Sequence, residues 1–116
     1  MKKVLFVSYL PAVGSIYVNE TFRTAFGMYA EDVEPSIILM MDSVVALNEG
    51  YSPERIGLLT IKTVHRYLKR YGTRVYAVRE DLESRRVDVE SAWNVEILKR
   101  EELSDFFHSF DTVIFM

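Results

Sequence analysis

The chain has 116 residues, of which 49% are hydrophobic and 27% are charged, and its formal net charge is −3. This size and composition are typical of one globular domain, and we treat residues 1–116 as a single domain. The acidic balance argues against a generally basic nucleic-acid-binding surface but is compatible with a local basic face. No apolar run approaches the ~20 residues of a membrane helix, and the first residues are too short and strand-like for a signal peptide. We therefore expect a cytoplasmic protein that makes no membrane contact.

Five segments have the apolar, β-branched composition of buried strands. They are residues 3–8, 36–41, 74–78, 95–98 and 111–116. Helical periodicity or helix-capping residues occur between them, at residues 19–30, 44–49, 52–71 and 103–110. Strands that alternate with helices at this spacing predict right-handed crossovers and a parallel sheet. The expected fold is therefore a Rossmann-like, three-layer α/β/α domain with a five-stranded parallel sheet.

The absence of cysteine limits the chemistry of the chain. Without a thiol there is no disulfide, no thiolate ligand for a metal and no thiol nucleophile. The two histidines, His65 and His108, are far apart in sequence, and no G-x-S-x-G motif supports a catalytic triad. We therefore predict no catalytic residue, no metal site and no cofactor.

A cluster of charged side chains directly follows the third predicted strand. Six charged residues lie within positions 79–86, and parallel α/β proteins place ligands just past the carboxyl ends of their strands. The alternating signs indicate ion pairs one helical turn apart, such as Asp81 with Arg85. Neither a nucleophile nor a desolvating apolar pocket is evident beside these carboxylates. The cluster therefore favours a structural turn or a contact surface over acid–base catalysis.

Two other stretches are candidate binding surfaces. The loop after the first strand has one glycine, Gly14, and no phosphate-binding glycine motif, and its apolar side chains are typical of residues that cover a partner or a pocket. The predicted helix 52–71 carries four cations on one face, which are Lys62, Arg66, Lys69 and Arg70. Such a face is ordinarily solvated. Contact with RNA phosphates is the alternative, although no aromatic residues are interleaved for base stacking.

Three stretches resemble the DsrE/DsrF-like sulfur-relay proteins, and most closely their DsrF/TusC branch. They are "KKVLFVSYLPAVGS" at the start, "PSIILMMDSVVALNEGYSPERIG" in the middle and "FDTVIFM" at the end. The resemblance implies a five-stranded parallel sheet with an internal first strand, and subunits that assemble into larger rings. It also implies a role in moving sulfur as a cysteine-bound persulfide, for tRNA 2-thiouridine synthesis or for sulfur oxidation.

The resemblance also implies where the carrier cysteine of the family would lie. In DsrE/TusD-type members this cysteine follows the third strand, and the matching place in this chain is around Glu80 and Asp81. We call these two residues the carrier position. Neither side chain can hold a persulfide, so the chain departs from the carrier members. The departure fits the DsrF/TusC branch, which the resemblance identifies as a non-carrier subunit.

Two function hypotheses follow from these features. The first is a non-catalytic subunit that supports a cysteine-bearing partner, either related DsrE/TusD-like and DsrH/TusB-like subunits or a second copy, with an indirect link to tRNA. The alternative is a homo-oligomeric protein on the same scaffold that binds a small anion or nucleotide. An enzyme that uses Asp or Glu alone is a third class. The predicted interface residues are Tyr9, Leu10, Val13, Ile16, Tyr17, Met41, Val44 and Val45.

Overall fold

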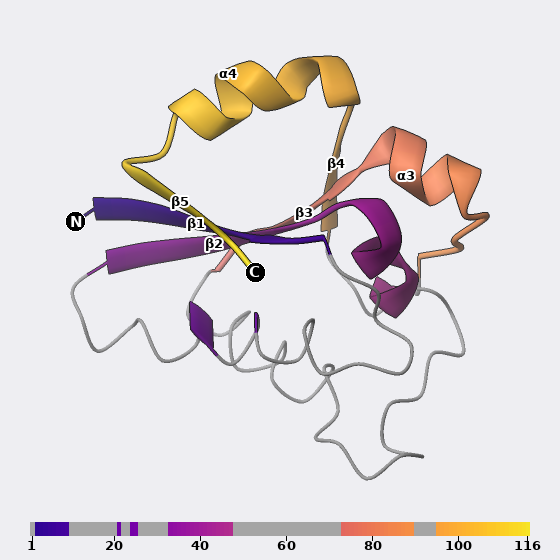
Figure 1. The fold of residues 1–116 in the computed structure, drawn as a ribbon, viewed down its shortest axis with the longest axis horizontal. Helices are drawn as coiled ribbons and strands as arrows, with labels where there is room; N and C mark the ends of the chain where they lie inside the picture. Colours follow the sequence, from indigo (N-terminus) through magenta and orange to yellow (C-terminus); the bar gives the residue numbers. More distant parts are fainter. Residues whose placement is uncertain (1, 10–20, 22–23, 26–32, 48–72, 90–94) are drawn as a thin grey trace, which may run out of the picture.

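The structure, a computed structural model, describes residues 2–9, 21, 24–25, 33–47, 73–89 and 95–116. The described elements are five strands and four short helices, and Figure 1 shows their arrangement. They are β1 (Lys2–Ser8), β2 (Val33–Leu39), the 3₁₀ helix η2 (Met41–Leu47), β3 (Val75–Val78), α3 (Arg79–Ser84), β4 (Val95–Leu98), the 3₁₀ helix η4 (Arg100–Glu102), α4 (Leu103–His108) and β5 (Thr112–Phe115).

The five strands form one parallel sheet in the order β4-β3-β2-β1-β5. Strand β1 is internal, with β2 on one side and β5 on the other. The α/β fold with a five-stranded parallel sheet is therefore confirmed, and so is the expectation of an internal first strand. In this order the chain moves outward from β1 to β4 and then returns to the far side of β1. The carboxyl ends of all five strands meet at one edge of the sheet, where η2 and α3 also lie (Figure 1).

The second strand begins earlier than the sequence predicts, and it contains Pro35. Proline lacks the N–H that a central strand uses in its ladder. The N–H of Ile37 points toward β3, where it donates to the carbonyl of Arg74 at 3.0 Å. Because residues two positions apart in a strand have the same orientation, the backbone nitrogen of Pro35 also faces β3. Pairing of β2 with β3 starts only at Ile37, so no ladder bond is lost at Pro35.

Apolar side chains alternate between the two faces of the sheet and form a core on each. On one face Phe6, Ile37 and Ala77 pack with buried residues of η2 and α3 and with Ala25. On the other face Leu5, Val7, Ile38 and Tyr76 pack against Leu103 and the phenylalanines of the α4 region. Among the described elements, α4 is the helix that covers this second face (Figure 1).

The end of β2 also differs from the sequence prediction. Strand pairing stops at Leu39, whereas the sequence predicted a strand through Met41. Met41 takes a left-handed backbone conformation, with φ of 55°, and it begins η2 three residues before the predicted helix start. A non-glycine residue with this φ cannot continue a strand.

In the described part of the chain no helix is long and apolar enough to cross a membrane.

Candidate functional site

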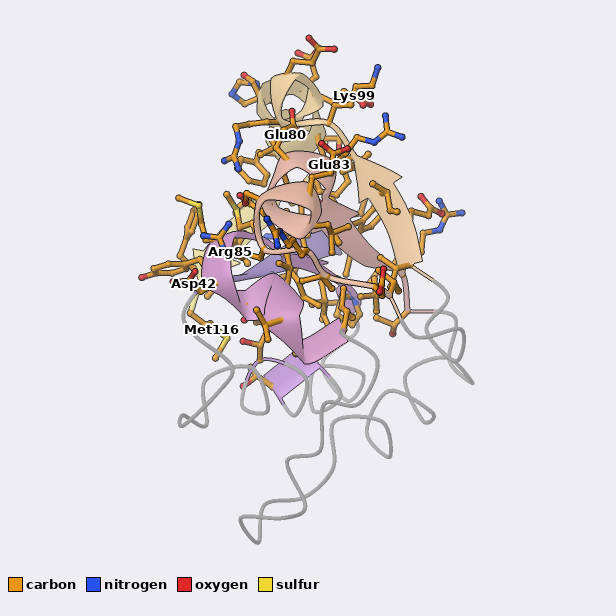
Figure 2. The ribbon with its side chains drawn as sticks, turned by 90° about the vertical axis from the view of Figure 1, so that its right-hand side faces the viewer. Asp42, Glu80, Glu83, Arg85, Lys99 and Met116 are labelled. Carbon is orange, nitrogen blue, oxygen red and sulfur yellow. The ribbon has the colours of Figure 1, made fainter. Side chains whose placement is uncertain are left out.

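The candidate site lies where β3 ends and α3 begins, at the carboxyl edge of the sheet. Val78 is the last residue of β3 and Arg79 the first of α3, so no loop separates the two elements. The carrier position, Glu80 and Asp81, therefore lies in the first turn of α3. Figure 2 shows this edge, with Glu80 near the start of α3 and Arg85 toward the side of Asp42 and Met116.

Asp81 is almost completely buried, with 3% of its surface exposed. This burial was not expected from the sequence, and the hydrogen-bond partners of the carboxylate are polar groups. Its Oδ1 accepts hydrogen bonds from the guanidinium groups of Arg100 and Arg85, the latter at 3.5 Å. Its Oδ2 accepts one from the backbone N–H of Met41 at 2.7 Å. A buried carboxylate persists when it is paired and hydrogen-bonded in this way.

The bond from Met41 fixes the turn between β2 and η2. The left-handed conformation of Met41 is unfavourable for a residue with a Cβ atom by about 1 kcal/mol, and the charge-assisted bond to Asp81 offsets this cost. The side chain of Ser43, inside the turn, also stabilises it. Its hydroxyl accepts from the N–H of Met40 at 3.1 Å and lies 2.6 Å from the carbonyl oxygen of Ser8. The turn is therefore held from β1 and from α3.

Arg85 connects α3 to η2. Its Nε donates to Oδ1 of Asp42 at 2.8 Å, and its Nη1 lies 2.9 Å from the hydroxyl of Ser84. The predicted ion pair between Asp81 and Arg85 is confirmed at 3.5 Å. Asp42, the partner of Arg85 on η2, lies in the first turn of that helix. Arg85 and Arg100 both contact Asp81, so part of their positive charge is balanced by this carboxylate.

Glu80 is the exposed member of the carrier position. Both oxygens of its carboxylate accept from the backbone N–H of Arg100, at 2.9 and 3.1 Å. This backbone hydrogen bond is the main reason why the pKa of Glu80 lies below its ordinary value. Arg100 therefore contacts the carrier position twice, through its amide at Glu80 and through its side chain at Asp81.

Arg100 was not identified from the sequence, although a signal for it exists. It follows the fourth predicted strand by two residues, and β3 and β4 are neighbours in the sheet. The carboxyl ends of neighbouring parallel strands are adjacent, so a cation just after β4 falls beside the anions just after β3. The adjacency was hidden because strand order does not follow from the sequence pattern.

The predicted interface residues divide into three groups. Tyr9 and Met41 are exposed at the carboxyl edge, and Val45 is half-buried. Val44 is 0% exposed and packs in the core, so it has no side-chain surface for a partner. Leu10, Val13, Ile16 and Tyr17 lie outside the described residues, as do the four cations Lys62, Arg66, Lys69 and Arg70.

An exposed aromatic side chain extends the apolar surface around Tyr9. Phe115 of β5 is 59% exposed, and its ring contacts that of Tyr9 with centroids 6.2 Å apart. Met116 follows Phe115, and its N–H donates to the carbonyl oxygen of Val7 at 2.9 Å. We call Tyr9, Met41 and Phe115 the apolar patch. Tyr9 follows β1, Met41 lies just after β2, and Phe115 is the last residue of β5. These three strands are neighbours in the sheet.

Comparison with known proteins gives a consistent assignment. The model of the DsrE/DsrF-like family matches residues 1–116 of the chain. A search of curated protein sequences gave no match. Among solved structures, the YchN protein of Escherichia coli is similar over 100% of both chains, with a TM-score of 0.82 and 21% identity. A protein of unknown function from Methanobacterium thermoautotrophicum is similar over 100% of both chains, with a TM-score of 0.73 and 13% identity. At these identities the two structures show the shared fold.

The burial of Asp81 predicts a stability cost when its carboxylate is removed. Asp81→Ala should lower the free energy of unfolding by about 1.5–3 kcal/mol, because charge-assisted hydrogen bonds to a buried group are lost. Glu83→Gln is the matched control on the same helix. It removes an exposed ion pair to Arg79 at 3.7 Å and should cost less than about 0.5 kcal/mol. Urea denaturation measures both, and equal losses would contradict the structural role of Asp81.

The depressed pKa of Glu80 predicts a pH-dependent contribution to stability. Because the folded pKa lies below the ordinary value of 4.5, ionised Glu80 stabilises the fold above that value. This contribution is lost as the pH falls through the folded pKa. The difference in unfolding free energy between the native protein and Glu80→Gln should therefore be largest near neutral pH and should shrink in acid. A difference that grows in acid would contradict this assignment.

Proposed function

The chain belongs to the DsrE/DsrF-like family, and from this membership we propose that it is a non-carrier subunit of a sulfur-relay complex. The family suggests a role related to sulfur relay. The finer proposal is that the chain binds and shapes a cysteine-bearing DsrE/TusD-like partner, together with a DsrH/TusB-like subunit or a second copy. Such a complex would serve tRNA 2-thiouridine synthesis or sulfur oxidation in the cytoplasm, as in the DsrF/TusC branch.

One observation carries this proposal. The carrier position holds a buried carboxylate with a backbone and two arginine partners, in a chain that contains no cysteine. A persulfide carrier needs a thiolate that a donor can reach. Asp81 has neither the atom nor the exposure for this role. Its contacts stabilise the same edge of the sheet that the family uses for chemistry, so this chain contributes structure there.

The apolar patch supports a partner at the same edge. Protein interfaces are enriched in aromatic residues and methionine, and the patch consists of Tyr9, Met41 and Phe115. Paired charges next to it, Asp42 with Arg85, provide a polar border. The alternative hypothesis needs cations free to bind an anion at the strand ends. Within the described residues, Arg85 and Arg100 both contact Asp81 and Arg79 pairs with Glu83. These three cations are already engaged, which supports the protein-binding role.

A first prediction concerns the partner contact. Phe115→Asp should weaken assembly with a co-encoded cysteine-bearing subunit by a few kcal/mol, because the contact would bury an unpaired charge. Ile97→Asp is the matched control. Ile97 is 53% exposed, but it lies on β4 at the opposite side of the sheet. Sedimentation of the mixed subunits at micromolar concentration measures both. Loss of assembly with Ile97→Asp alone would move the interface to β4.

A second variant separates the contact from folding. Met41→Gly removes an exposed apolar side chain and also relieves the left-handed backbone of this position. Glycine tolerates that conformation without the Cβ penalty. The subunit alone should therefore unfold at the same or a higher urea concentration, while assembly with the partner weakens. Lower stability together with unchanged assembly would contradict both assignments.

A further prediction concerns the chemistry. The native chain should not gain a sulfur atom when incubated with a persulfide donor, because it has no thiol. Glu80→Cys should gain one, and faster than Glu83→Cys, because Glu80 lies in the first turn of α3, where a thiolate is favoured. Mass spectrometry of the intact chain detects the added sulfur. A stable sulfur adduct on the native chain would overturn the non-carrier role.

A further inference from the structure

A cavity lies at the amino end of the strands, opposite the candidate functional site. It has a volume of about 430 Å³ and opens on the face of the sheet that α4 covers. The lining residues combine charged groups from the starts of the strands with aromatic groups from β3 and the α4 region. They are Lys3, Glu34, Ser36, Arg74, Tyr76, Glu96, Leu98, Phe106, Ser109 and Phe110.

One wall of the cavity is aromatic. The rings of Tyr76 and Phe106 meet edge to face with centroids 4.7 Å apart, and Phe106 meets Phe110 in the same way at 5.1 Å. Tyr76 is only 7% exposed, so the wall is fixed by packing against the core. Aromatic edges and faces of this kind favour an apolar or aromatic group of a ligand.

The other walls carry two cations and two anions. Lys3 and Glu34 are register partners on β1 and β2, and Arg74 and Glu96 form an ion pair at 3.8 Å. Arg74 also bonds the side chain of Tyr76, which is the largest cause of its raised pKa. Neighbouring strands are about 4.8 Å apart. In each pair, the cation and the anion therefore start from neighbouring strands and lie close together. This spacing suits a ligand that carries a positive and a negative group a short distance apart.

We propose that this cavity binds a small zwitterion with an aromatic body, of the class of the aromatic amino acids. The carboxylate of the ligand would accept from Arg74 or Lys3, and its ammonium group would donate to Glu96 or Glu34. Its ring would lie against Tyr76 and Phe110. A ligand with a single charge would leave one pair of these groups unmatched, and a nucleic-acid phosphate would meet two carboxylates.

The exposure of the ion pair makes this binding feasible. The side chains of Arg74 and Glu96 are 68% and 57% exposed, and their separation of 3.8 Å is at the limit of an ion pair. An exposed pair of this kind contributes at most about 1 kcal/mol. Breaking this pair therefore costs little, so Glu96 can turn toward a ligand, and Arg74 can meet the ligand from its place beside Tyr76 in the packed aromatic wall.

The proposal is independent of the sulfur-relay function. The cavity lies at the amino ends of the strands, whereas the carrier position and the apolar patch lie at the carboxyl ends. Its lining residues include none of Tyr9, Met41, Glu80, Asp81 or Phe115. Loss of ligand binding should therefore leave partner assembly unchanged, and loss of assembly should leave ligand binding unchanged.

Calorimetric titration of the full chain with L-phenylalanine, L-tyrosine and L-tryptophan tests the proposal. At least one should bind saturably, and 3-phenylpropionate and phenethylamine, which each lack one charge, should bind at least about tenfold more weakly. Arg74→Gln and Glu96→Gln should each weaken binding by at least about tenfold. Arg79→Gln, an exposed arginine outside this cavity, should have no effect.

Three results would overturn the proposal. The first is no saturable binding of any of the three amino acids up to about 10 mM, beyond the weakest affinity expected of a specific site. The second is equal binding of the analogues with one charge. The third is unchanged binding in both Arg74→Gln and Glu96→Gln. Circular dichroism of each variant checks that these exposed substitutions leave the fold intact.

Discussion

The buried carboxylate of Asp81 connects three neighbouring strand ends. Left unpaired, a buried charge costs several kcal/mol, so its partners must be in place whenever the chain is folded. They come from the turn after β2, from α3 itself and from the segment after β4. One side chain therefore contacts three segments at this end of the sheet. The left-handed backbone of Met41 is a consequence, because its N–H must point toward Asp81.

This constraint gives Asp81, the buried member of the carrier position, a structural role. A persulfide terminates in an exposed, nucleophilic sulfur that two partners reach in turn. The carboxylate of Asp81 is instead enclosed and bonded to two guanidinium groups. Opening the site to a donor would break these bonds. The apolar patch and Glu80 are exposed beside it, and they form part of the surface that we propose for contact with a partner chain.

Local sequence patterns predicted the sheet well and the site less well. Apolar runs identified all five strands, and the i, i+4 spacing identified the pair of Asp81 with Arg85. The burial of Asp81 could not be predicted, because its other partners are 40 and 19 residues away. The start of β2 was missed because proline was taken as a strand boundary. Pro35 is tolerated only because β3 begins later, and that is a property of the register.

Paired charges lie at both ends of the sheet, but they differ in burial. Burial determines whether a pair is fixed in the fold or can separate to contact a ligand. Asp81 at the carboxyl end is enclosed, so moving its partners would expose an unpaired charge in a poorly solvated place. Arg74 and Glu96 at the amino end are in water and lie 3.8 Å apart, where their attraction is screened. The first set of charges is therefore rigid, and it stabilises the turn and helix beside the apolar patch. The second set can exchange its mutual contact for a ligand, which a rigid pair could not do.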